Sequence, residues 1–322
     1  MTATEPRADK SDTRRRFLRG TAAVAAGGAA AVAMPNVSRA QTAVLKMQGA
    51  WGAKDIFNDM ALEYVDRVNN MAGNRLKIEY LIAGAVVKPF SLQDAVNDGV
   101  LDAGHHVPAY WYGKNKAASL FGTGPYYGWS ASQFLAWVHR GGGKELYREL
   151  VQDVLGLNLV GFFCMPMPQQ PLGWFKNPPT SPDDLKGTKY RTVGLAADVM
   201  QAMGLAVAQL PGGEILPAME RGVIDAFEFN NPTSDRRFGA QDVAKNYMMG
   251  SYHQASETFE IIFNKSKFDE LPDEHKAVLE YATEAANTSN LGLAFDSYSN
   301  DFAALQTEYG VTVRRTPPSI LE

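Results

Sequence analysis

Arg191 occupies a position in the sequence that favours the binding of an anion. It lies near the end of a predicted strand, 188–193, directly before Gly194 and a predicted helix, 195–203. In open α/β sheets, ligands bind beyond the carboxyl ends of the strands. A guanidinium there, beside a helix N-terminus, can hold a carboxylate through two parallel hydrogen bonds. An arginine paired with a structural acid is the alternative interpretation.

Two other predicted strands end in side chains that carry oxygen. Gln169 and Gln170 follow Met165-Pro166-Met167-Pro168, a loop whose prolines restrict the backbone. Glu228 ends a predicted strand, 223–229, and runs into Phe229-Asn230-Asn231-Pro232. Carboxylate, amide and carbonyl oxygens are the hard ligands typical of Na⁺ or Ca²⁺. The alternatives are ordinary surface amides and an acid solvated at a strand end.

Three aromatic residues, Tyr110, Trp111 and Tyr112, stand together in a predicted turn. Large aromatic side chains dominate protein cores, and they also line the apolar part of ligand pockets. The segment is therefore either core or the apolar wall of a pocket.

Residue patterns typical of enzymes are missing from the sequence. It contains no GxxxxGK[ST], HExxH, GxSxG or GxGxxG motif. His105 and His106 are neighbours in a predicted strand, so they point to opposite faces, as do Asp225 and Glu228. The single cysteine, Cys164, rules out a disulfide scaffold and lies in an apolar run, where a core position is expected.

The elements that must position these side chains alternate between strands and helices. The predicted strands are 43–48, 75–81, 101–107, 159–164, 188–193, 223–229 and 259–264; the predicted helices are 54–71, 90–97, 132–138, 144–154, 195–203, 214–221, 273–286 and 291–309. This alternation predicts βαβ units with mostly parallel sheets. Two such blocks, with a break near 120–160, predict an α/β protein of two lobes.

The first 40 residues have the composition of a cleaved export signal. Basic residues are concentrated in 1–19, residues 20–38 carry no charge, and Ser38-Arg39-Ala40 offers small residues at a cleavage site. The string TRRRFLR at 13–19 resembles the twin-arginine motif S/T-R-R-x-F-L-K. The uncharged run is too short and too poor in large apolar residues to favour a transmembrane anchor.

The net charge of −4 hides two segments of opposite sign. The first 40 residues hold seven Lys/Arg and three Asp/Glu, so residues 41–322 keep 24 and 32, a net charge of −8. An acidic, soluble protein in the periplasm is therefore expected, with no general affinity for nucleic acid or anionic membranes.

Three segments together resemble the periplasmic solute-binding subunits of tripartite ATP-independent periplasmic (TRAP) transporters, in the branch that binds 2-oxo acids and lactate. They are LKGTKYR at 185–191, LPGGEILPAMERGVIDA at 210–226 and YWYGK at 110–114. The similarity extends over nearly all of 43–318. It implies a periplasmic-binding-protein fold with mixed, mostly parallel sheets and a hinged cleft. We expect 41–160 mainly in lobe 1, 161–260 mainly in lobe 2, and helices of 261–322 crossing between them.

The resemblance also implies the ligands of a joint substrate and cation site. Arg191 would bind the substrate carboxylate, and Gln170 would contact the substrate. A bridging Na⁺ or Ca²⁺ would be held by the Glu228 carboxylate, the Phe229 carbonyl and Gln254. We expect the remaining substrate contacts from the apolar wall, made by Tyr110, Trp111 and Phe229.

This sequence departs from the family pattern at three places. Phe229 stands where related 2-oxo acid binders often have Trp, and Gln254 is neutral where some relatives have Glu, so Na⁺ and Ca²⁺ stay open. The chain ends at Glu322, before a long helix that helps some relatives to dimerise, so a homodimer stays open as well.

The expected function is that of a TRAP solute-binding protein that captures a small monocarboxylate, such as pyruvate or lactate, and delivers it to the membrane permease subunits. An exported metal-dependent α/β enzyme acting on carboxylates is the first alternative, although no nucleophile–base pair supports it. A sensory or structural periplasmic domain without a permease partner is the second.

Overall fold

The structure is a computed structural model that describes residues 42–124 and 128–322. Contacts divide the chain into residues 1–41 and 42–322, and only the second unit is described below. The predicted export signal, residues 1–40, therefore lies outside the described residues. None of the described helices is both long enough and apolar enough to cross a membrane.

The first sheet contains five strands in the order β2-β1-β3-β10-β4. Their bounds are β1 (Ala43–Gly49), β2 (Leu76–Leu81), β3 (Ala103–His106), β4 (Leu159–Met167) and β10 (Glu257–Asn264). The pairs of β1 with β2 and β3 are parallel, whereas β10 runs antiparallel to β3 and β4. We call the elements built on this sheet the first lobe.

The second sheet contains six strands in the order β11-β9-β5-β8-β6-β7. Their bounds are β5 (Gly173–Phe175), β6 (Lys189–Arg191), β7 (Ala206–Ala208), β8 (Ala226–Phe227), β9 (Asn246–Met249) and β11 (Thr312–Arg315). β5 is antiparallel to both neighbours, and the other pairs are parallel. The sheets are thus mixed, as predicted. We call the elements built on this sheet the second lobe.

Helices surround both sheets. The helix α2 begins where the Asp55 side chain accepts a hydrogen bond from the amide of Phe57, and it buries a stripe that includes Phe57, Met60 and Tyr64. The other α-helices are α3 (Leu92–Asn97), α4 (Ala131–Arg140), α5 (Gly143–Arg148), α6 (Leu195–Ala202), α7 (Ile215–Glu220), α8 (Pro232–Phe238), α9 (Ala240–Val243), α10 (Lys265–Asp269), α11 (Asp273–Thr307) and α12 (Pro318–Leu321); α2 itself is Ile56–Met71. The shorter helical turns are η1 (Pro89–Ser91), η2 (Pro108–Trp111), η3 (Lys116–Phe121), η4 (Glu149–Val154), η5 (Pro182–Leu185) and η6 (Gly212–Glu214).

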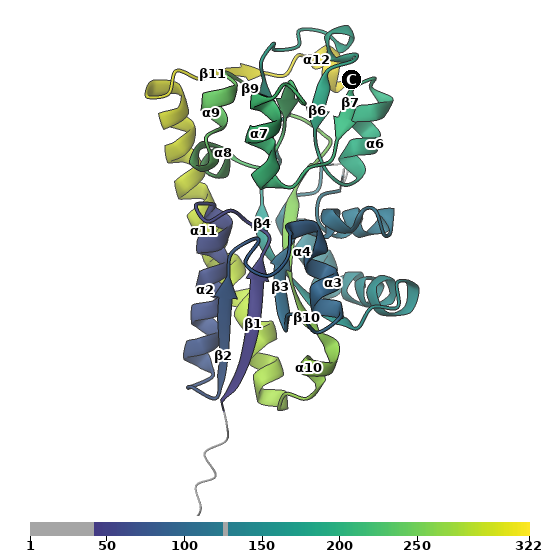
Figure 1. The fold of residues 1–322 in the computed structure, drawn as a ribbon, viewed down its shortest axis with the longest axis vertical. Helices are drawn as coiled ribbons and strands as arrows, with labels where there is room; N and C mark the ends of the chain where they lie inside the picture. The colour runs from purple at the N-terminus through teal and green to yellow at the C-terminus, as the bar shows by residue number, and fades with distance from the viewer. Residues whose placement is uncertain (1–41, 125–127) are drawn as a thin grey trace, which may run out of the picture. The chain divides into compact units, whose positions relative to one another are not determined.

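The chain passes between the lobes at three places. Residues 168–172 lead from β4 to β5, and residues 250–256 lead from β9 to β10. The helix α11 is the third connection, because it packs against α2 and β4 in the first lobe and against α8 in the second (Figure 1). A boundary at residue 160 cuts β4, and β10 pairs in the first sheet although it begins before residue 261. The sheets therefore do not follow the predicted ranges 41–160 and 161–260.

The prediction of two helices, 273–286 and 291–309, is wrong, since α11 is one continuous helix of 35 residues. Asn287 and Asn290, which lie between the two predicted helices, are both buried in it. The Asn287 side chain accepts a hydrogen bond from the Met165 amide at 2.9 Å, at the edge of β4. Tertiary contacts thus outweigh the weak helix propensity of this stretch.

Candidate functional site

A buried cavity lies between the two lobes, where the connecting segments meet. Its walls are Trp51, Phe57, Val107, Tyr110, Arg191, Val193, Phe229, Asn230, Gln254, Glu257 and Phe259. The space open to the centre of a water molecule is about 10 Å³. That is room for about one water molecule. The lobes are therefore closed on a small, mixed polar and aromatic cavity.

Arg191 is the last residue of β6 and is 1% exposed. Its Nε donates to the Leu210 carbonyl at 2.8 Å, and its Nη1 donates to the carbonyl and to Oε1 of Glu228 at 2.7 and 3.1 Å. Nη2 has no hydrogen-bond partner among the described residues. The ion pair with a structural acid is therefore present, yet one arm of a fixed guanidinium stays free to bind an anion.

Glu228 follows β8 directly and is fully buried. The strand pairing of β8 ends at Phe227, one residue earlier. The backbone carbonyl of Glu228 accepts a hydrogen bond from the Arg191 side chain. Burial raises the pKa of the Glu228 carboxyl to about 7, while Arg191 and then the nearby Thr192 hydroxyl oppose the rise. The Thr192 hydroxyl lies near this carboxyl but makes no hydrogen bond to it. Oε2 of Glu228 therefore has no hydrogen-bond partner among the described residues.

Gln170 and Gln254 lie on two neighbouring connecting segments. The backbone amide of Gln170 donates to the backbone carbonyl of Gln254 at 3.2 Å, and this hydrogen bond joins the two segments. Both side chains are buried, and the Gln170 side-chain oxygen and both polar atoms of the Gln254 side chain have no partner among the described residues. Buried amide groups without partners are costly, so these atoms are suited to a bound ligand or ion.

Glu257 is a residue of the cavity that sequence reasoning missed. The predicted strand 259–264 left it outside, whereas β10 begins at Glu257 and is buried throughout. Its Oε2 accepts from Gln170 Nε2 at 2.8 Å and also from Asn230 Nδ2. An acid two residues before the mostly apolar predicted strand 259–264 was the signal that could have identified it, because a buried carboxylate needs partners.

The apolar walls of the cavity are aromatic and come mostly from the first lobe. Trp51 stacks on Phe259 with ring centroids 4.3 Å apart, and Tyr110 lies 6.0 Å from Trp51. Tyr110 and Phe229 line the cavity, as expected. Trp111 does not, because the tight turn η2 directs it into the first lobe, where it stacks on His106 and donates to its Nδ1 at 3.1 Å.

The donor set fits a hard cation. The described residues contain no group of three or more His, Cys, Asp or Glu side chains that could hold a metal. Glu228 Oε2 and the Gln254 side-chain oxygen are nevertheless buried acceptors without partners. The carbonyl of Phe229 accepts no hydrogen bond from the described residues either. One carboxylate with amide and carbonyl oxygens is a combination that Na⁺ or Ca²⁺ accepts.

Contacts across the cleft hold the lobes together. Asp55, at the start of α2, accepts from the Ser234 hydroxyl of α8 at 2.7 Å. On another part of the cleft, the Tyr112 hydroxyl donates to Asp198 of α6 at 2.5 Å. A second cavity, with about 270 Å³ open to water, shares Trp51 and Phe229 with the first.

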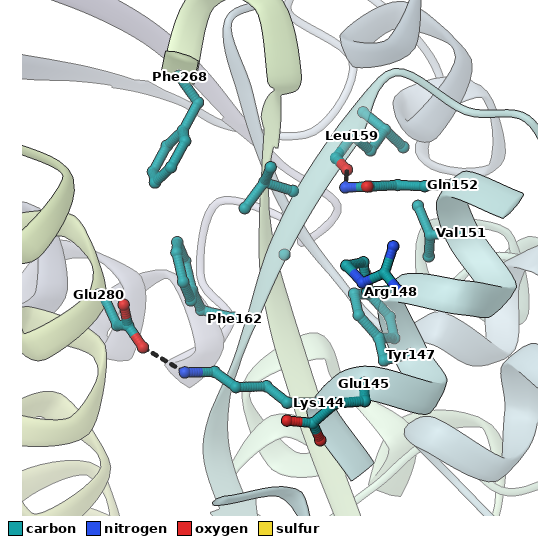
Figure 2. Close-up of a pocket in the computed structure, with 12 residues that line it drawn as sticks. Lys144, Glu145, Tyr147, Arg148, Val151, Gln152, Leu159, Phe162, Phe268 and Glu280 are labelled. Carbon is teal, nitrogen blue, oxygen red and sulfur yellow. Dashed lines mark hydrogen bonds and ion pairs between the residues drawn. The ribbon is translucent and has the colours of Figure 1, made fainter. Parts of the chain in front are cut away.

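A larger cavity, with about 390 Å³ open to water, lies away from the cleft at the outer edge of β4. Its walls come from β4, α5, η4, α10 and α11, and Figure 2 shows Lys144 and Glu280 paired across it. Arg148 there is 58% exposed and pairs with Asp153. Solvated and paired charges hold a small anion weakly, so the cavity between the lobes is the better candidate site.

Comparisons with known proteins agree with this geometry. The model of the family described as bacterial extracellular solute-binding protein, family 7, matches residues 47–322. A monocarboxylate 2-oxoacid-binding periplasmic protein of Nostoc sp. is 33% identical over 285 residues, which cover 86% of this chain and 77% of the relative.

Two solved structures are similar over most of their length. One is a TRAP transporter solute-binding protein from Bordetella bronchiseptica, a mixed-occupancy dimer with copurified calcium and picolinate. It has a TM-score of 0.81 and 27% identity, and the match covers 87% of this chain and 82% of that one. The other, from Pseudoalteromonas atlantica, has bound sodium and pyruvate, a TM-score of 0.81, 28% identity, and coverage of 87% and 84%.

The two-lobed fold and the resemblance to TRAP solute-binding proteins are thereby confirmed, and the enzyme alternative finds no support. The chain belongs to family 7 of the bacterial extracellular solute-binding proteins, the family of the TRAP transporter solute-binding proteins.

Proposed function

We propose that this protein binds a small monocarboxylate, a 2-oxo or 2-hydroxy acid such as pyruvate or lactate, together with Na⁺ or Ca²⁺. The observation that carries the proposal is the free arm of Arg191 at a closed cavity, which is also lined by Gln254, whose buried side-chain oxygen has no partner among the described residues. The bound pyruvate of the Pseudoalteromonas protein and the name of the Nostoc relative support the ligand class.

Each residue has a role in this proposal. Arg191 neutralises the ligand carboxylate. Gln170 contacts the ligand through its side-chain oxygen, which is free because the side-chain nitrogen donates to Glu257. The Glu228 carboxylate, the Phe229 carbonyl and Gln254 hold the cation, which supplies positive charge to the ligand oxygens. Tyr110 and the ring of Phe229 form the apolar wall, and Trp111 supports that wall from within the first lobe.

Binding requires the lobes to open and close. The cavity has room for about one water molecule, and a 2-oxo acid is several times larger. Ligand must therefore enter a more open form, in which the three connecting segments act as the hinge. Contacts such as Tyr112 with Asp198 then close the lobes over the ligand.

The protein delivers its ligand to the TRAP membrane permease subunits from the periplasm. Export by the twin-arginine route rests on residues 1–40, through the motif at 13–19. A homodimer is compatible with this function, and the Bordetella protein is described as a dimer.

A thermal-shift screen of carboxylates tests the binding proposal, because a ligand that binds the folded state raises the melting temperature. We expect pyruvate, lactate or a close relative to raise the Tm by several degrees with Na⁺ or Ca²⁺ present, and less after treatment with chelator and exchange into a potassium buffer. A screen in which no monocarboxylate raises the Tm with either cation would refute it. Detectable turnover of a bound acid would favour the enzyme alternative.

A further inference from the structure

Glu257 is the buried carboxylate that lines the cavity, whereas Glu228 is not one of its lining residues and is paired with the lining Arg191. Glu257 is 4% exposed and lines the cavity together with Arg191 and Gln254. It begins β10, opposite Met167 of β4, so it lies where a connecting segment joins the first sheet. Glu257 thus faces the same space as Phe229 and Gln254, two of the three cation ligands proposed above.

The hydrogen bonds of Glu257 identify it as an acceptor. Its Oε2 accepts from the side-chain amides of Gln170 and Asn230. The Asn230 side-chain oxygen accepts in turn from Asn231 at 2.8 Å, which fixes the orientation of the Asn230 amide. The Gln170 amide consequently donates through nitrogen and leaves its oxygen without a partner. These contacts suit a carboxylate that keeps its charge.

The positive charge of the described residues around the cavity does not balance the two buried carboxylates, Glu257 in its wall and Glu228 paired with Arg191. Arg191 is the guanidinium of the cavity, and its ion pair is with Glu228. No ion pair joins Glu257 to a basic side chain within 42–124 or 128–322. A buried carboxylate without a counter-charge is strongly unfavourable. Burial, followed by the charge of Glu228, raises the pKa of Glu257 well above its ordinary value, which is the electrostatic sign of this deficit.

We propose that Glu257 is the second carboxylate of the cation site and that, with Glu228, it makes the site selective for divalent Ca²⁺ over Na⁺. This inference rests on the proposed function, because it assumes the same cation site. Independent support comes from Gln254, whose side chain is fully buried, lines the cavity and has neither polar atom paired among the described residues. The neutral side chain of Gln254 is thus followed, three residues later, by the acid Glu257.

The charge balance explains the selectivity. Two glutamates and one ligand carboxylate carry three negative charges, which Ca²⁺ and Arg191 together neutralise. Na⁺ in the same place would leave one buried negative charge uncompensated. The number of charged ligands is a main determinant of calcium affinity in protein sites.

The Glu257→Gln variant distinguishes a role of Glu257 in binding the cation from a role in positioning Gln170 alone. The glutamine side-chain oxygen can still accept from the two neighbouring amides, but the negative charge is lost. Glu260→Gln is the matched control. Glu260 is equally buried on β10, but it contacts His106 and Tyr147 in the first lobe and does not line the cavity.

The experiment is calorimetric titration of the chelator-treated protein with CaCl₂, with and without pyruvate, alongside pyruvate titrations in NaCl or CaCl₂. We expect Glu257→Gln to weaken Ca²⁺ binding at least about tenfold, to weaken pyruvate binding much less in Na⁺ than in Ca²⁺, and to unfold at a Tm that shows a folded protein. We expect Glu260→Gln to bind Ca²⁺ like the wild type.

The outcomes distinguish the two proposals. Equal Ca²⁺ affinity of wild type and Glu257→Gln, within about threefold, would overturn the role of Glu257 and leave the proposed function intact. A wild type that binds pyruvate in Na⁺ but does not bind Ca²⁺ would also overturn the role of Glu257 and leave the proposed function intact. If Glu257→Gln fails to fold, Glu257→Asp, which keeps the charge and shortens the side chain, must retain preference for Ca²⁺. A wild type that binds no monocarboxylate with either cation overturns both.

Discussion

Replacing Arg191 by lysine keeps the positive charge of the cavity and removes the fork of the guanidinium. In the wild type, three hydrogen bonds to Leu210 and Glu228 use Nε and Nη1, and Nη2 is free. A single lysine Nζ can keep the pair with Glu228, but it cannot also reach the Leu210 carbonyl and a ligand carboxylate. The variant therefore tests the geometry of the fork at constant charge.

The expected effect follows from the bonds lost. A hydrogen bond to a charged group contributes about 1.5–3 kcal/mol, so losing the arm that binds the ligand lowers affinity about ten- to a hundredfold. Losing the hydrogen bond to the part-buried Leu210 carbonyl lowers the free energy of unfolding by about 0.5–1.5 kcal/mol. The loss of affinity and the loss of stability are separate predictions from the same substitution.

Calorimetric titration with pyruvate measures the affinity, and urea denaturation measures the stability. Arg236→Lys is the control, because Arg236 pairs with Asp301 at 2.7 Å and does not line the cavity. Its pyruvate affinity should stay within about twofold of wild type. A folded Arg191→Lys protein that binds pyruvate as tightly as wild type would refute the assignment of Arg191 to the ligand carboxylate.

Two further predictions concern stability and closure. Burial raises the pKa of Glu228 and Asp235 to about 7 and that of Asp55 to about 6. Acids with raised pKa values, to which Glu257 and Glu260 also belong, bind more protons in the folded than in the unfolded state. Burial lowers the pKa of His105, His106 and His253 to about 3, which has the opposite effect below about pH 6.5. The free energy of unfolding of the ligand-free protein should therefore fall as pH rises from about 6 to 7; urea midpoints that rise over this range would contradict it. Asp198→Ala removes the contact with Tyr112 across the cleft, and such a partly exposed contact contributes about 0.5–1 kcal/mol. We expect about two- to fivefold faster ligand release in stopped-flow measurements, and an unchanged rate would show that closure does not depend on this contact.

Much of the fold could be predicted because its signals are local. Alternation of strand and helix patterns predicted two α/β blocks, and α2 with its apolar stripe lies within the predicted helix 54–71. The break predicted near Asn287 failed for a physical reason. The sequence shows weak helix formers there, whereas the folded protein buries Asn287 against the edge of β4.

The candidate site likewise has features that the sequence predicts and features that only the tertiary structure determines. The sequence by itself determined which side chains stand near predicted strand ends, and so it made Arg191 and Glu228 candidates for the proposed site. Only the tertiary structure decided that Glu257 joins them and that Trp111 does not line the cavity. Strand ends follow from local periodicity, but a shared cavity depends on which distant segments pack together. The packing of the 168–172 segment on the 250–256 segment is a long-range contact that no local pattern encodes.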